Sequence, residues 1–282
     1  AKGVIPKPSV TRLKAVGDWL KVNGEAIYGT TASPCPFEPG WGRMTARKNR
    51  LYLHIFRWPG KQFVLHGLES KVKKAYLLSD VKKKPLTCEQ SHDTKAELHT
   101  LRLSLPARAP DKRSSVIVLE TVGAPMVDQT QVQDGKGLIT LEAFNGEIRQ
   151  PAGSRPMTRG RFGTIEQWFN SRSRVTWQVK VAQPGTYDVS VLTQTEHDGR
   201  WEGGHHMKVS VGRQTASATA RKAQEKDNPR APSDLLDVVS PIGQIVVQRA
   251  GLIDVTLRME KIVKAKGIGP KLRAVQLVPL AS

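Results

Sequence analysis

Val175-Thr176-Trp177-Gln178-Val179-Lys180-Val181 and Tyr187-Asp188-Val189-Ser190-Val191-Leu192 are two runs of alternating apolar and polar residues, separated by Gln183-Pro184-Gly185-Thr186. Successive side chains of a strand point to opposite faces, so each run predicts a strand with one buried face. Pro and Gly in the connection are typical of a turn. The stretch therefore predicts a β-hairpin, with Trp177 on the face that enters the core.

Further strands are predicted on both sides of this hairpin. They lie at residues 138–143, 206–211, 243–248, 253–259 and 272–277. No helical period separates them, which favours an antiparallel β-sandwich over a parallel sheet. Residues 215–236 are polar and are predicted to form a long insertion.

The first half of the chain opens with an amphipathic helix. Pro8-Ser9 is typical of a helix start and Asn23-Gly24 of a helix stop, which predicts a helix over residues 9–23. Apolar residues recur along one face of it: Val10, Leu13, Val16 and Leu20. Such a stripe must be buried against something. We expect its packing partner to be absent from this chain.

Short β-runs broken by turn residues follow this helix. They lie at residues 51–56, 63–65, 72–78, 101–105 and 116–119, again with no intervening helical period. Residues 123–137 are polar and rich in turn formers, as expected of a linker between domains. The predicted fold class is mainly β, with one helix and two antiparallel β-sandwich domains.

Composition sets limits on the function. The 282 residues carry 44 Lys and Arg against 25 Asp and Glu, a net charge of +19, with 38% hydrophobic and 6% aromatic residues. No apolar run is long enough to span a membrane, so we expect no membrane contact. The basic residues are spread along the chain and no nucleic-acid-binding motif occurs, so nucleic acid is not expected as a partner. Attraction to sulfated or otherwise acidic polysaccharide stays open, as does a general basic bias of secreted proteins.

The two cysteines carry little information. Cys35 lies in a Pro-rich loop and Cys88 between predicted strands. A disulfide requires the fold to bring their Cα atoms within about 7 Å. We expect two separate, inert thiols.

Several motifs in the first half resemble the glycoside hydrolase family 29 α-L-fucosidases. Residues 4–30 resemble the last helix and exit segment of the catalytic barrel, and four later motifs resemble the β-domain that follows it. These motifs are Trp41-Gly42-Arg43-Met44-Thr45, Leu51-Tyr52-Leu53-His54-Ile55-Phe56-Arg57-Trp58-Pro59, Lys71-Val72-Lys73-Lys74-Ala75-Tyr76-Leu77-Leu78 and Ser115-Val116-Ile117-Val118-Leu119-Glu120. The resemblance covers roughly the first 125 residues.

This resemblance implies a non-catalytic role. In that family the nucleophile and the acid/base come from the barrel, so no catalytic residue is expected in this chain and the isolated chain should be inactive. The helix would be a remnant of a truncated (β/α) barrel, and the missing N-terminal barrel would be its partner. The family also implies a secreted or periplasmic protein, although no signal peptide is visible ahead of Ala1.

The second half resembles galactose-binding-like jelly rolls, such as carbohydrate-binding modules of families 6 and 35. The domain boundaries implied are residues 1–34 for the barrel remnant, 35–122 for the fucosidase-type β-sandwich, 123–137 for the linker and 138–282 for the jelly roll. Such modules hold sugar with an aromatic platform and polar loop residues. The candidates here are Trp168, Arg200, Trp201, Glu202 and His205. The alternative is that Trp168 and Trp177 are core or rim residues and that the loop at residues 195–205 is solvated and binds nothing.

Metal binding has a weaker basis. The loop at residues 195–206 contains carboxylates and histidines, but no zinc-ligand spacing occurs. The resemblance implies a structural calcium ion near the first strand, with Glu142 and Glu147 as candidate ligands. No other cofactor is expected.

Three functions are compatible with these observations. The first is the non-catalytic C-terminal part of an α-L-fucosidase that removes terminal L-fucose with retention, bracing the barrel and binding a fucosylated or acidic glycan. The second is an autonomous carbohydrate-binding protein. The third is a polyanion-binding β-sandwich, whose binding would fall steeply with added salt.

Overall fold

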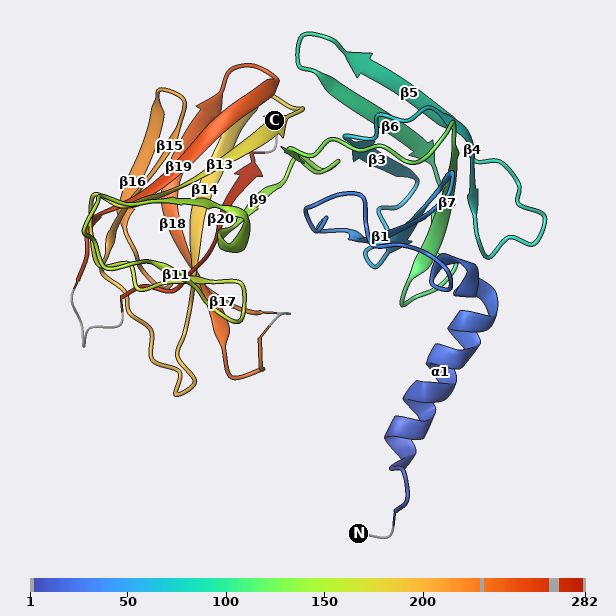
Figure 1. Cartoon of the computed structure of the whole chain (residues 1–282), viewed down its shortest axis with the longest axis horizontal. Helices are drawn as coiled ribbons and strands as arrows, with labels where there is room; N and C mark the ends of the chain where they lie inside the picture. The colour runs from blue at the N-terminus through green and yellow to red at the C-terminus, as the bar shows by residue number, and fades with distance from the viewer. Residues whose placement is uncertain (1–2, 229–230, 264–268, 281–282) are drawn as a thin grey trace. The chain divides into compact units, whose positions relative to one another are not determined.

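The structure is a computed structural model, and it describes residues 3–228, 231–263 and 269–280. The chain divides into two compact units, one of Ala1–Asp93 and His99–Gln129 and one of Thr94–Leu98 and Thr130–Ser282. The division falls at Gln129, inside the segment predicted as a linker. The described part is mainly β, as predicted (Figure 1). It has one α-helix, which belongs to the first unit, and each unit contains antiparallel sheets.

The first unit is an antiparallel sandwich of two sheets. Its strands are β1 (Gly42–Arg47), β2 (Arg50–Ile55), β3 (Gln62–His66), β4 (Val72–Leu77), β5 (Cys88–Asp93), β6 (Leu98–Ser104) and β7 (Ser115–Thr121). One sheet has the strand order β1-β2-β7-β4 and the other the order β3-β6-β5. The sequence did not predict β1 or β5. For β5 the reason is that none of its residues is buried, so it lacks an apolar pattern.

Alternation along the strands of this unit produces its core. Leu51 and Leu53 of β2 pack with Leu101 and Leu103 of β6, and each of these side chains is at most 1% exposed. Tyr52 points to the other face of β2, where it joins a second buried cluster with Tyr76. The sheet that contains β2 is therefore covered on both faces.

The helix contacts this second cluster only through its C-terminal end. Helix α1 (Lys7–Asn23) begins two residues earlier than predicted, with Pro8 inside its first turn. It ends at Asn23 as predicted, with Gly24 as its C-cap. A 3-10 helix, η1 (Gly24–Ala26), follows it. Trp19 packs on the cluster and its indole N–H donates to the carbonyl of Ser114 at 2.7 Å. Farther from this end, α1 extends away from the sheet, as Figure 1 shows.

The second unit is a larger antiparallel sandwich. Its strands are β8 (Gln131–Val132), β9 (Ile139–Glu142), β10 (Glu147–Arg149), β11 (Thr158–Arg159), β12 (Ile165–Glu166), β13 (Arg174–Val181), β14 (Gly185–Gln194), β15 (His206–Val211), β16 (Gln214–Thr219), β17 (Gln224–Asp227), β18 (Leu236–Val247), β19 (Gly251–Lys261) and β20 (Leu272–Pro279), and the 3-10 helix η2 (Ala143–Asn145) follows β9. One sheet has the order β10-β13-β19-β15-β16, with β8 parallel to β13. The other has the order β11-β12-β20-β14-β18-β17, with β9 beside β20. The predicted polar insertion contains β16 and β17.

The predicted hairpin is wrong, although both of its strands exist. β13 pairs with β19 and β10, whereas β14 pairs with β18 and β20, so the Pro-Gly connection crosses from one sheet to the other. The crossing is held by Gln133, which is 2% exposed. Its Oε1 accepts the backbone N–H groups of Ala182 and Gln183, both at 2.8 Å, and its Nε2 donates to the hydroxyl of Tyr187 at 2.7 Å.

The core of the second unit lies between its two sheets. Val175, Trp177 and Val179 of β13 face Val189 and Val191 of β14 across it, with exposures of 5% or less. Trp177 is thus a core residue, as predicted. Its indole N–H donates to the carbonyl of Glu142 at 2.9 Å, which satisfies the polar end of the ring.

The two cysteines are free thiols, which confirms the prediction. Both are partly buried against the core of the first sandwich, and burial raises the pKa of each thiol. Among the described residues, no helix is both long and apolar enough to cross a membrane.

Candidate functional site

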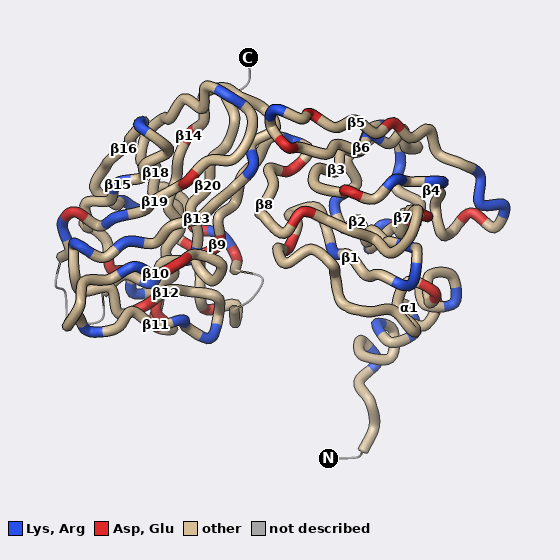
Figure 2. The backbone as a smooth tube through the Cα atoms, turned by 45° about the horizontal axis from the view of Figure 1, so that its top comes forward, with Lys and Arg blue, Asp and Glu red and all other residues tan. Residues whose placement is uncertain are grey.

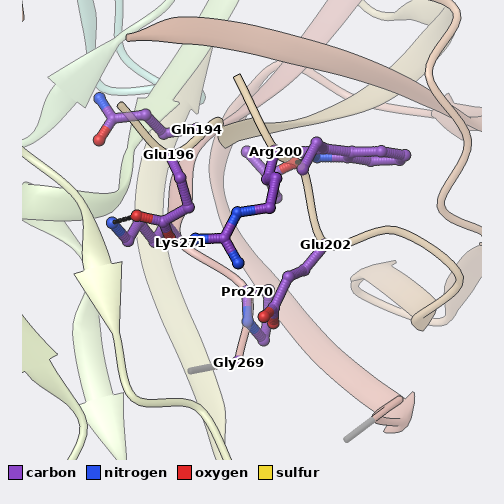
Figure 3. Close-up of a pocket in the computed structure, with 9 residues that line it drawn as sticks. Gln194, Glu196, Arg200, Glu202, Gly269, Pro270 and Lys271 are labelled. Atoms are coloured by element: carbon purple, nitrogen blue, oxygen red, sulfur yellow. Dashed lines mark hydrogen bonds and ion pairs between the residues drawn. The ribbon is translucent and has the colours of Figure 1, made fainter. Parts of the chain in front are cut away.

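A small pocket lies at one end of the second sandwich. It is formed by the end of β14, the loop that follows β14 and the segment that precedes β20, as Figure 3 shows. Its lining residues are Thr193, Gln194, Glu196, Arg200, Trp201, Glu202, Gly269, Pro270 and Lys271. Three of the five residues predicted to contact sugar, Arg200, Trp201 and Glu202, are therefore brought together here.

Trp201 is the aromatic residue of this pocket. The ring is half-buried and packs against the edge of the core, and its N–H donates to the hydroxyl of Thr193 at 2.8 Å. The backbone of Gly203 lies directly under the ring, since a Cβ at that position would stand 2.3 Å from the indole. Gly203 therefore allows the chain to turn back close to Trp201.

Charged side chains of both signs surround the pocket. Lys271 Nζ lies 2.7 Å from Glu196 Oε2, and these two side chains are only 17% and 21% exposed. Arg200 is more exposed, and its Nε pairs with the carboxylate of Asp198. In Figure 3 the Arg200 side chain extends into the space between Glu196 and Glu202. The site thus has nearly balanced charge.

Two buried polar atoms of the pocket have no hydrogen-bond partner among the described residues. They are Oε2 of Glu202, an acceptor, and Nε2 of Gln194, a donor on a side chain that is 5% exposed. Burial raises the pKa of Glu202, and the neighbouring Glu196 carboxylate raises it further. Unpartnered buried groups are costly and often mark a position for a ligand or an ordered water.

The size of the pocket limits what enters it. The space open to the centre of a water molecule is about 10 Å³, which corresponds to roughly one water. A single hydroxyl group of a ligand fits this space, whereas a pyranose ring does not. A sugar would therefore lie at the mouth of the pocket, beside Trp201 and Arg200.

The two other predicted sugar contacts lie elsewhere. Trp168 is fully buried in the core of the second sandwich, and its N–H donates to the carbonyl of Asn170 at 3.2 Å, so neither face of its ring is open to a sugar. His205 is also fully buried, and its Nδ1 accepts the backbone N–H of Val263 at 3.1 Å. Burial lowers the pKa of His205. Both side chains are thus closed to a sugar, although Nε2 of His205 has no hydrogen-bond partner among the described residues.

The calcium interpretation finds no supporting geometry. Glu142 lies 3.5 Å from the buried guanidinium of Arg273, which supplies the positive charge that a metal ion would bring. Glu147 is exposed and pairs with Arg149 at 2.8 Å. Within residues 3–228, 231–263 and 269–280, no group of three or more His, Cys, Asp or Glu side chains is placed to hold a metal ion.

The residues that sequence analysis missed are Gln194 and Lys271. Gln194 ends a strand whose pattern predicts only alternating burial, and Lys271 lies 75 residues from its partner Glu196. No local motif joins these positions. They meet because β20 and β18 flank β14 in the sheet.

Comparison with known proteins gives one informative likeness. No protein-family model matches the sequence, and no curated protein matches it. Among solved structures, the chain is similar to an α-L-fucosidase from Vibrio sp. strain EJY3, with a TM-score of 0.71 and 23% identity, over 98% of this chain and 46% of that chain. The chain therefore spans less than half of the length of that enzyme.

Two further structures are less similar. An α-L-fucosidase isoenzyme from Paenibacillus thiaminolyticus is 36% identical over 43% of this chain and 28% of its own, with a TM-score of 0.37. A GH26-CBM35 mannanase from Podospora anserina is 17% identical over 52% of this chain and 28% of its own, with a TM-score of 0.33. The likeness to the Vibrio enzyme covers nearly the whole chain, and it shows that this chain has a fucosidase-related fold.

Proposed function

We propose that the chain functions as the non-catalytic, C-terminal part of a glycoside hydrolase family 29 α-L-fucosidase. The observation that carries this proposal is the likeness to the Vibrio enzyme, which extends over nearly all of this chain but under half of that one. The resemblance of residues 4–30 to the end of a catalytic barrel supports it. In this proposal the nucleophile and the acid/base belong to the barrel, and this chain braces it.

The surface of α1 supports the bracing role. Only Asn23 of its seventeen residues is buried, while Leu13, Val16 and Val22 are 62%, 54% and 52% exposed. Large apolar side chains on a helix are normally covered by a packing partner. In the proposed enzyme, the catalytic barrel covers them.

The pocket of the second sandwich supports a glycan-binding role beside the catalytic one. A hydroxyl group both donates and accepts a hydrogen bond, so it can satisfy Glu202 Oε2 and be satisfied by a donor of the pocket. Trp201 offers an apolar surface for the C–H face of a sugar ring. A linked site of this kind raises the concentration of substrate near the barrel. A glycan substrate of this type agrees with a secreted or periplasmic protein.

The first experiment tests the non-catalytic assignment. The purified chain is incubated with an aryl α-L-fucoside, and released aglycone is measured. We expect no hydrolysis above the buffer control, because the proposal assigns both carboxyl groups of the retaining glycosidase site to the barrel. Turnover that a single Asp or Glu substitution within this chain abolishes would contradict the proposal.

A second experiment tests the glycan site separately. Binding of fucosylated oligosaccharides to the wild type is compared with binding to Trp201→Ala and Glu202→Gln. The matched control is Trp58→Ala, which removes a partly buried tryptophan of the first unit, whose N–H donates to Pro106 at 2.9 Å. We expect loss of binding in the two pocket variants only. Equal binding by all four proteins would remove the glycan site and leave the bracing role standing.

A further inference from the structure

The first unit carries a concentrated group of lysines that the proposed function does not use. Residues 71–84 contain six lysines and one acidic residue, Asp80. We call the six the lysine surface: Lys71, Lys73, Lys74, Lys82, Lys83 and Lys84. In Figure 2 the turn that follows β4 appears as a run of blue at the edge of the first unit.

The fold presents this surface at a sheet edge. β4 is the last strand of its sheet, and the turn after it is closed by Asp80. The Asp80 carboxylate accepts the backbone N–H groups of Lys82 and Lys84 at 3.0 and 2.9 Å. The one acidic side chain of the segment is thus used to fix the turn.

Tyr76 brings the strand and the turn together. The ammonium groups of Lys74 and Lys83 each lie 5.4 Å from the centre of its ring, so they are at most twice that distance apart. Burial raises the pKa of Tyr76 to about 12, so the ring adds no negative charge near neutral pH. The ring itself is fully buried and offers no face to a ligand.

The charges around the surface leave a positive excess. Glu25 and Glu120 lie nearby, and both pair with Arg50, at 2.6 and 3.3 Å. Lys83 is close enough to help lower the pKa of Glu25, against the effect of burial. Within the described part of the chain, none of the six lysines forms an ion pair with an acidic residue. Glu69 precedes Lys71 by two residues, and Glu89 is next to Gln90, whose side chain accepts the backbone N–H of Val72 at 2.7 Å. The seven cations still outnumber these two carboxylates together with Asp80, Glu25 and Glu120.

We propose that the lysine surface binds a sulfated polysaccharide. An extended polyanion matches a group of lysines without ion pairs that is spread along a strand edge and its turn, by charge complementarity. Single-stranded nucleic acid needs exposed aromatic rings for base stacking, and the only ring among these lysines is buried. This site lies in the first unit and is distinct from the pocket of the second, so it goes beyond the proposed glycan role.

The test compares two variants with the same change in net charge. Lys73, Lys82 and Lys84 are exposed, and their replacement by Gln removes three charges from the surface. The control replaces Lys136, Arg213 and Arg249 by Gln, which are exposed positions of the second unit. Binding of dextran sulfate and of unsulfated dextran is measured with the full chain at low and high salt, together with circular dichroism spectra of each variant.

We expect the wild type to bind dextran sulfate but not dextran, and to lose binding as salt rises. The triple variant of the lysine surface should bind about tenfold or more weakly at low salt, with a shallower salt dependence, because three local charges no longer act. The control should change binding by less than about twofold, since none of its three residues belongs to the lysine surface. Equal weakening in both variants would mean that net charge alone attracts the polymer, and would overturn the site.

Two more measurements decide the kind of partner. Single-stranded DNA and vesicles with anionic lipid are tested at the same salt concentration. Tighter binding of either one than of dextran sulfate, lost in the lysine-surface variant, would overturn the choice of polysaccharide. Weaker binding of both would support it.

Discussion

Apolar side chains are buried in the interior of the second sandwich but largely exposed on the helix α1. In the sandwich, Val175, Val179 and Val191 are fully buried, and even the large ring of Trp168 has no exposed surface. In α1, Leu13 and Val16 are more than half exposed. Both segments have regular apolar patterns, so the pattern alone does not decide burial. What decides it is whether the same chain supplies a second apolar surface.

The two regions therefore contribute differently, the sandwich to the stability of the chain and α1 to the proposed function. Burial of apolar side chains is the main stabilising term in folding, so the second sandwich holds much of the stability of its unit within itself. The exposed stripe of α1 contributes little to the stability of the chain alone. In the proposed enzyme it contributes to the interface with the barrel.

The strongest way to sharpen this comparison is Trp168→Ala. Removal of a fully buried indole leaves a cavity, so we expect a loss of about 3 to 5 kcal/mol of unfolding free energy. The carbonyl of Asn170 loses one donor but keeps the backbone N–H of Ser173 at 3.0 Å. Urea unfolding followed by circular dichroism measures it. A loss below about 1 kcal/mol would mean that the ring is not a core residue, and would return Trp168 to the set of sugar contacts.

A pH-dependent prediction concerns the buried acid of the same sandwich. Asp237 is 5% exposed, and burial raises its pKa from 3.8 to about 6, against the opposing charge of Arg273. Because the pKa is higher in the folded state than in the unfolded state, protonation of Asp237 favours folding. This contribution to the unfolding free energy is complete below pH 3.8 and is lost as the pH rises through about 6. A shift of this size corresponds to about 3 kcal/mol.

The variant Asp237→Asn removes this titration. Its unfolding free energy, minus that of the wild type, should increase by about 2 kcal/mol between pH 4 and pH 7, because at pH 4 part of the full difference is already lost. The attraction to Arg273 acts on the ionised carboxyl group and is already included in the pKa of about 6, so any other effect of the Asn side chain shifts the curve by a constant. Chemical denaturation at several pH values gives the two curves. Parallel curves would show that the carboxyl of Asp237 titrates normally in the folded protein.

A third prediction concerns the crossing between the two sheets. Gln133→Ala leaves the N–H groups of Ala182 and Gln183 without their acceptor, and we expect it to destabilise the second unit by about 2 kcal/mol. The control is Gln129→Ala, an exposed glutamine close by in the sequence, with an effect below about 0.5 kcal/mol. Similar effects of both changes would show that Gln133 does not hold the crossing.

The strands could be predicted from the sequence, but their pairing could not. Alternation in residues 175–192 shows correctly that each run has one buried face. The same pattern arises whether two strands pair in one sheet or face each other across a sandwich, because the buried faces meet in both cases. The polar contact that separates the two cases, Gln133, lies in a segment that has the composition of a linker.

The candidate site was predictable only where its residues are adjacent in sequence. The loop with Arg200, Trp201 and Glu202 combines an aromatic residue, charges and glycines, which is a local signal. Burial is not a local signal, so Trp168 and His205 had the right residue types for a sugar site but are core residues. Lys271 and Glu196 form an ion pair because β20, which follows Lys271, lies next to β14, which precedes Glu196.

The smallest expected change in unfolding free energy is for a substitution on the exposed face of α1. Leu13→Ala removes a side chain that is 62% exposed and introduces the best helix former, so the unfolding free energy should change by less than about 0.5 kcal/mol. Hydrogen exchange should agree, with fast exchange in the first turns of α1 and slow exchange in β13 and β14. Because every buried leucine costs far more when truncated, a loss above about 2 kcal/mol in a monomer, with protected amides in α1, would mean that this chain covers the helix itself. The bracing role would then lose its structural basis.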